Sequence, residues 1–109
     1  MMVAEERRTN ERKRMARLEM MKTAVPFKSG MRWGLRQGGK VVVPPVYRNI
    51  QSPVGYYCAV EVSPCRWGII MLDGKVVVEA GYSKVVINGD GTARLTVFPG
   101  KEKVVELGT

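Results

Sequence analysis

The sequence predicts a mainly β protein, built as an antiparallel meander of repeated β-hairpins with an N-terminal basic helix. Glycine (12 residues) and valine recur through the C-terminal four fifths of the 109-residue chain, which favours short strands joined by tight turns. A Trp-Gly pair occurs twice, each time followed by a glycine-containing turn and a run of valines. Residues 1–22 contain no glycine, proline or aromatic residue, a composition typical of a helix.

The chain divides into three predicted segments. Residues 1–22 form the predicted basic helical segment, which contains seven basic and four acidic residues. Pro26 interrupts any continuation of the helix because it lacks an N–H and disfavours the α conformation of the residue before it. We therefore expect a linker over residues 23–30. Residues 31–107 form the predicted β-domain, and the 45% apolar content of the chain is enough for one modest core.

The β-domain contains an internal repeat. Trp33-Gly34 and Trp67-Gly68 are 34 residues apart, whereas the lysines and tyrosines that follow are 35 residues apart. The extra residue of the second copy therefore lies just before its turn. We expect Gly38-Gly39 and Asp73-Gly74 to form type I′ turns, because these residues tolerate positive φ. A third, degenerate copy without Trp-Gly is predicted where Ala93 to Thr96 repeats Ala59 to Val62 after 34 residues.

The repeat places eight strands, which we expect to pair as sequential hairpins. They cover about 31–37, 40–44, 56–62, 66–72, 75–79, 84–87, 92–98 and 102–107. Trp33 and Trp67 are the largest side chains of their hairpins and are predicted to anchor the core. Gly34 and Gly68 are predicted to leave room for a neighbouring strand.

These motifs resemble the WG-repeat family of bacterial β-repeats, whose pattern combines Trp-Gly, a strand, Asp-Gly-Lys, a Val/Ile run, Pro-Pro and Tyr. The resemblance covers about residues 31–107, although Glu79-Ala80 stands where the first copy has Pro44-Pro45. It implies a binding or scaffold module with no shared catalytic residues. A looser resemblance, in the basic segment leading into the Trp-Gly module, is to an accessory domain of Bacteroides helicase-type proteins. This resemblance implies that the chain is part of a larger protein.

The sequence offers little for catalysis. It contains no histidine, no phosphate-binding Gly-rich loop and no Gly-x-Ser-x-Gly motif, so we expect no enzyme, no cofactor and no metal site. A carboxylate pair brought together by folding is the alternative that sequence leaves open. Cys58 and Cys65 are expected to be reduced thiols, and no apolar run is long enough to span a membrane. We expect a cytoplasmic protein with no membrane partner.

The formal net charge of +8 points to an anionic partner. Nucleic acid is the first candidate, with neighbouring domains of a larger protein or a separate partner protein as others. The basic residues predicted to contact nucleic acid are Arg7, Arg8, Arg12, Lys13, Arg14, Arg17, Arg32, Arg36, Arg48 and Arg66. The same charges can instead be a solvated face or a protection of sheet edges, in which case the chain is a protein-binding or structural scaffold domain.

Overall fold

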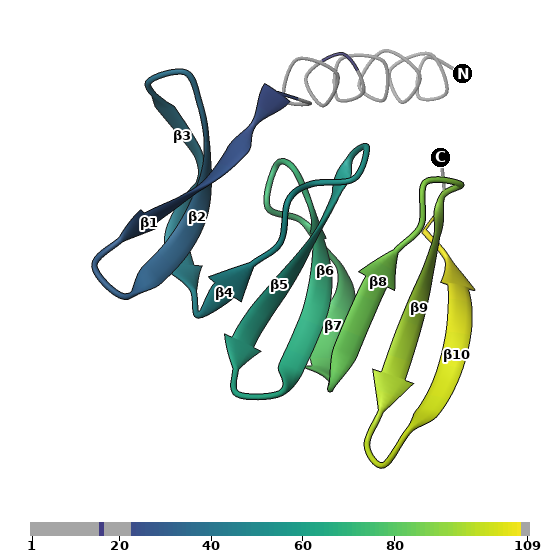
Figure 1. Ribbon diagram of the computed structural model, residues 1–109. Helices are drawn as coiled ribbons and strands as arrows, with labels where there is room; N and C mark the ends of the chain where they lie inside the picture. Colours follow the sequence, from purple (N-terminus) through teal and green to yellow (C-terminus); the bar gives the residue numbers. More distant parts are fainter. Residues whose placement is uncertain (1–15, 17–22, 108–109) are drawn as a thin grey trace, which may run out of the picture.

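The computed structural model describes Ala16 and residues 23–107, and this part of the protein is mainly β. Its strands form three antiparallel sheets that follow one another along the molecule (Figure 1). The first sheet has the order β1 (Val25–Ser29), β2 (Arg32–Gln37), β3 (Lys40–Tyr47). The second has the order β4 (Asn49–Ile50), β5 (Tyr57–Ser63), β6 (Arg66–Met71), β7 (Val76–Tyr82). The third contains β8 (Lys84–Ile87), β9 (Thr92–Val97), β10 (Lys101–Glu106).

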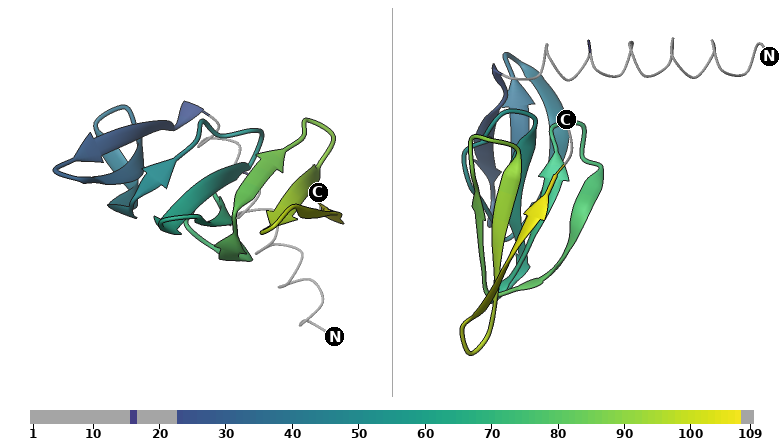
Figure 2. Two further views of the ribbon diagram at one scale, coloured as in Figure 1. Left: turned by 60° about the horizontal axis from the view of Figure 1, so that its bottom comes forward. Right: turned by 90° about the vertical axis from the view of Figure 1, so that its right-hand side faces the viewer.

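The predicted fold needs correction at its N-terminal end and in its number of sheets. The basic helix is not supported, because no helix is defined in the described part of the chain and residues 1–22, apart from Ala16, lie outside it. The stretch 23–30, predicted as a linker, contains β1 instead. Pro26 is compatible with this strand because β1 is at the edge of its sheet, where a missing N–H costs no ladder hydrogen bond. We expected a single sheet, but the strands form three sheets in a row. Their strands lie behind one another in the right-hand view of Figure 2.

Strand pairing shows the internal repetition directly. In the first sheet Trp33 pairs with Tyr47, and the β2–β3 ladder shifts register on both sides of Leu35. In the second sheet Trp67 pairs with Tyr82, and the β6–β7 ladder shifts in the same way around Ile69. The two Trp-Gly hairpins therefore share an irregular ladder as well as a sequence pattern.

The glycine after each tryptophan is required by this irregular ladder. A Cβ atom built on Gly34 would lie 2.8 Å from the carbonyl carbon of Pro44, and one on Gly68 would lie 2.5 Å from the carbonyl oxygen of Val78. Both distances are below 3.0 Å, which real Cβ atoms essentially never show, and the obstructing atoms are backbone. The prediction that these glycines make room for a neighbouring strand agrees with this geometry.

The turns differ from the predicted type I′ geometry. In the first copy Gly38 has φ 58° and Gly39 has no positive φ, so only the first central residue is left-handed, as in a type II′ turn. In the second copy the Gly74 N–H donates to the Met71 carbonyl, and Gly74 alone has positive φ, at 91°. The second loop thus has three residues where the first has two, and this explains the change in repeat spacing from 34 to 35 residues.

The third copy is offset by 35 residues from the second, not by the predicted 34. The Leu72 N–H donates to the Tyr56 carbonyl, and the Leu107 N–H donates to the Gly91 carbonyl in the same way. At this offset Lys103 occupies the position of Gly68. Because a lysine has a Cβ atom where β6 has glycine, another strand could not cross β10 as closely as β7 crosses β6. In agreement with this, β10 is the edge strand of its sheet.

The core begins two residues after each tryptophan, further from the hairpin tips. Leu35 and Ile69, two residues after each tryptophan on the same side of the strand, are fully buried, as are Leu72, Val85 and Leu95. The tryptophans are only half-buried because they stand next to the hairpin tips. Trp67 still packs against the core cluster, whereas Trp33 is not part of it, so the predicted core role of Trp33 is wrong.

Candidate nucleic-acid interface

The positive charge of the described chain is concentrated in residues 23–60, which hold the first Trp-Gly hairpin and the segments next to it and which we call the first copy. No acidic residue occurs between Glu19 and Glu61, while residues 23–60 contain five basic side chains. Residues 61–107 carry six basic and six acidic side chains, which cancel. The basic residues of the first copy are Lys28, Arg32, Arg36, Lys40 and Arg48. Any long-range attraction of the described residues for an anion therefore acts through this end of the molecule.

Two of these cations stand beside the half-buried Trp33. Lys28 on β1 is the cross-strand partner of Trp33 on β2, and its ammonium lies 5.9 Å from the centre of the indole ring. Arg48 follows β3 directly and reaches the same place. Together with Met31 and Asn49, these residues line a hollow of about 220 Å³, which we call the Trp33 hollow. An aromatic ring and two cations that line one hollow suit an anion with a flat, apolar part.

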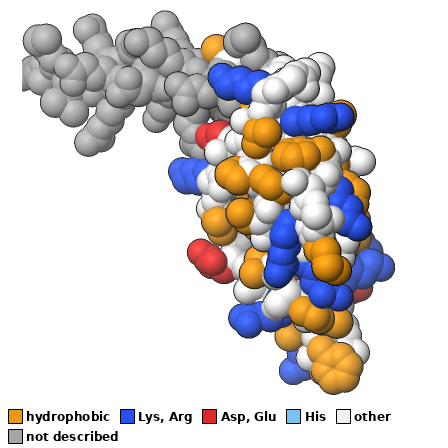
Figure 3. Space-filling view, turned by 90° about the vertical axis from the view of Figure 1, so that its left-hand side faces the viewer, with side chains coloured by type: hydrophobic (Ala, Val, Ile, Leu, Met, Phe, Trp, Pro, Cys, Tyr) orange, Lys and Arg blue, Asp and Glu red, His pale blue; other side chains and the backbone are white. Residues whose placement is uncertain are grey.

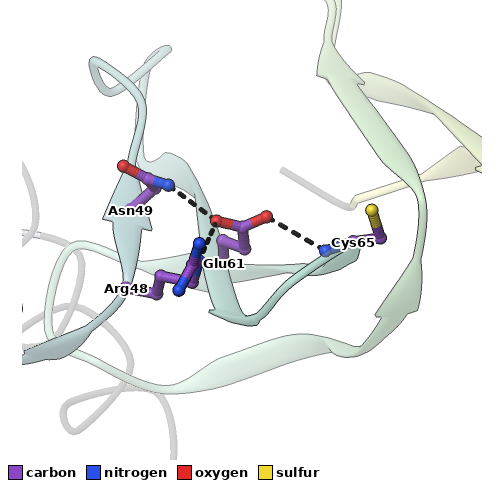
Figure 4. Close-up of polar contacts among 4 residues, drawn as sticks. All are labelled: Arg48, Asn49, Glu61 and Cys65. Atoms are coloured by element: carbon purple, nitrogen blue, oxygen red, sulfur yellow. Dashed lines mark hydrogen bonds and ion pairs between the residues drawn. The ribbon is translucent and has the colours of Figure 1, made fainter.

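Glu61 fixes the polar side of the Trp33 hollow (Figure 4). Its carboxylate is nearly buried, and Oε1 accepts a hydrogen bond from Asn49 Nδ2 at 2.6 Å and lies 3.4 Å from Arg48 Nε. Its other oxygen accepts from the Cys65 N–H at 3.2 Å. The Arg48 side chain nevertheless stays 52% exposed, so its remaining N–H groups can meet a ligand. Glu61 therefore acts as a positioning group for both Arg48 and Asn49.

The other predicted contact residues do not join this cluster. Arg32 and Arg36 are exposed on β2 and project from the side of the sheet opposite Leu35. Arg66 begins β6 at the position of the second copy that corresponds to Arg32. The remaining predicted contacts lie outside the described residues; they are Arg7, Arg8, Arg12, Lys13, Arg14 and Arg17.

Arg32 and Arg36 belong to a second basic surface on the outer side of the first sheet. Here the Arg36 guanidinium lies 6.0 Å from the ring centre of Phe27, and Val25 and Val41 are both 51% exposed. Figure 3 looks onto this end of the molecule, where Lys and Arg side chains mix with hydrophobic ones and acidic side chains are sparse. We call this surface the first-sheet face.

The second copy provides a natural comparison for the Trp33 hollow. The cross-strand partner of Trp67 is Glu61, where Trp33 has Lys28. Ser83, whose N–H donates to the Thr96 carbonyl as that of Arg48 donates to Glu61, takes the place of Arg48. The second copy therefore has an acidic and a neutral residue at the two positions where the first copy has cations. The shared fold thus carries different chemistry in its two copies.

A larger hollow, about 330 Å³, lies between the loop around Tyr56 and the loop from Asn88 to Gly91. Its charged group is Asp90, whose carboxylate accepts from the Thr92 hydroxyl at 2.6 Å and the Thr92 N–H at 3.0 Å. These hydrogen bonds lower the pKa of Asp90, which keeps it ionised. A fixed negative charge opposes binding of a polyanion, so we place the candidate interface at the Trp33 hollow despite its smaller volume.

Among the described residues there is no group of three His, Cys, Asp or Glu side chains that could hold a metal ion, and no helix able to cross a membrane. Both cysteines are free; Cys58 is buried, and burial raises its pKa to about 12. Cys65 is exposed at the tip of the β5–β6 hairpin with φ 60°.

Comparison with known proteins gives no match: no family model, no curated protein and no solved structure is significantly similar to the chain.

Sequence reasoning missed Lys28, Met31, Asn49 and Glu61. Lys28 lay within the predicted linker, and the contact between Asn49 and Glu61 joins two strands that the sequence did not pair. One sequence signal could have pointed to the region, namely the absence of acidic residues between Glu19 and Glu61.

Proposed function

We propose that this chain is a non-catalytic accessory module that contacts nucleic acid through the basic residues of its first copy. The module acts in the cytoplasm as part of a larger bacterial protein, in keeping with the resemblance to WG repeats and to helicase-associated segments. The observation that carries the proposal is the acid-free first copy, whose five cations include the two that flank Trp33. Neutralising several phosphates releases counterions, which supplies sequence-independent affinity.

Fluorescence anisotropy of labelled oligonucleotides across a salt series tests this proposal. Because three to five cations can reach phosphates, we expect the logarithm of the affinity to fall with the logarithm of salt concentration with a slope of about −2 to −4. Absence of salt-dependent binding to both single-stranded and duplex oligonucleotides at low ionic strength would refute the proposal.

A second candidate function is docking onto a protein surface or a neighbouring domain. The observation that favours it is the exposed apolar area of the first-sheet face, where Val25, Val41 and Val46 are each more than half exposed. Such a patch is a common mark of an interaction surface. Changing Val41 and Val46 to Thr should leave oligonucleotide binding intact if the valines serve a protein partner, and should weaken it if they belong to the nucleic-acid interface.

A further inference from the structure

The Trp33 hollow has a shape and chemistry that suit one unpaired nucleobase. Its apolar components are the indole ring of Trp33 and the Met31 side chain, which is 85% exposed. Its volume of about 220 Å³ is below the 300–1,000 Å³ typical of drug-sized pockets. A single flat ring fits these limits better than a whole cofactor does.

The polar groups of the hollow match the rest of a nucleotide. Lys28 and Arg48 provide two positive charges for a phosphate, and Arg48 is held in place by Glu61. Asn49 uses its amide nitrogen on Glu61, and its carbonyl oxygen points away from that carboxylate (Figure 4). This oxygen remains available to accept a hydrogen bond from a base.

We propose that the Trp33 hollow binds one base of single-stranded nucleic acid, with the base stacked on Trp33 and its phosphate held by Lys28 and Arg48. This inference rests on the proposed function and gives it a substrate class. A base in a duplex has both faces covered by its neighbours, so it cannot stack on an indole ring. The first copy therefore prefers single strands.

The Lys28 ammonium lies over the indole ring in the structure, and a stacked base must displace it. Its distance of 5.9 Å from the ring centre is close to the limit of a cation–π contact, and Lys28 is exposed. Cation–π contacts at exposed sites are weak, whereas stacking of a base on an aromatic side chain is generally stronger. The flexible lysine can then move to the neighbouring phosphate.

The chain contains only two tryptophans, which makes the site directly observable. In a Trp67→Phe variant, Trp33 is the only tryptophan and every residue that lines the hollow is kept. We expect an oligothymidylate of 15 nucleotides to quench its fluorescence with the same midpoint as the anisotropy change, and a blunt duplex to leave it unquenched. In the matched Trp33→Phe variant, the remaining Trp67 emission should not change on binding.

Affinity gives a second readout. Trp33→Ala should weaken oligothymidylate binding about tenfold or more and change duplex binding less than about twofold. Circular dichroism confirms that the variant is folded; if it is not, the fluorescence experiment alone decides. If Trp33→Ala binds oligothymidylate with the wild-type affinity and salt dependence, and the Trp33 fluorescence of the Trp67→Phe variant is not quenched, the inference is overturned and the proposed function stays in place. Loss of all salt-dependent binding would overturn both.

Discussion

Substitution of Gly68 by alanine tests whether the Trp-Gly pair has an architectural role. The added Cβ would lie 2.5 Å from the Val78 carbonyl oxygen and 2.8 Å from the Ala80 nitrogen, whereas ordinary contacts begin at 3.4 Å. Strand β7 would have to move by about 0.9 Å, the difference between 3.4 and 2.5 Å. Because the obstacle is backbone, we expect a loss at the upper end of the overpacking range, about 3 kcal/mol in the free energy of unfolding.

Urea denaturation followed by circular dichroism measures this loss. Gly39→Ala is the matched control, since no atom lies within 4 Å of a Cβ built there and Gly39 has no positive φ. It should be neutral or stabilising by up to about 1 kcal/mol through the unfolded state. A Gly68→Ala protein as stable as its Gly39→Ala counterpart would refute the close-crossing account of the ladder.

Three further predictions concern stability. Tyr57→Phe should cost about 1–2 kcal/mol in urea denaturation, because the Tyr57 hydroxyl donates a buried hydrogen bond of 2.7 Å to the Leu107 carbonyl. The free energy of unfolding should fall as the pH rises from about 9 towards 12, because the Cys58 pKa is raised to about 12 when folded and the unfolded thiol ionises first; in Cys58→Ala this decline should be shallower. Trp67→Ala should destabilise the protein more than Trp33→Ala, by about 1 kcal/mol or more, since only Trp67 packs against the core; equal losses in urea denaturation would contradict this difference.

The repeat logic explains how much of the fold could be predicted. Runs of valines and glycine-rich turns located most strands to within a few residues, because hairpins are encoded locally. The spacing change between the copies also placed a one-residue insertion next to the second turn, where the structure has a three-residue loop ending in Gly74. Turn type was beyond this reasoning, since Gly-Gly and Asp-Gly are compatible with several geometries.

The candidate site was less predictable because it is assembled from distant positions. Arg48 was selected for its charge and its neighbour Tyr47, but its importance comes from the contact with Glu61, 13 residues later. Trp33 and Trp67 look equivalent in the sequence. Only strand register shows that one has Lys28 as its cross-strand partner and the other has Glu61.

The claim that nucleic acid binds to the first copy has a direct test in paired charge reversals. Arg32→Glu with Lys40→Glu changes the first hairpin, and Arg66→Glu with Lys75→Glu changes the equivalent exposed positions of the second. Both variants lower the net charge equally, so a general loss of attraction affects them alike. We predict that the first variant loses at least about tenfold in oligonucleotide affinity at low salt, and the second less than about threefold. Equal losses in the two variants would contradict an interface located on the first copy.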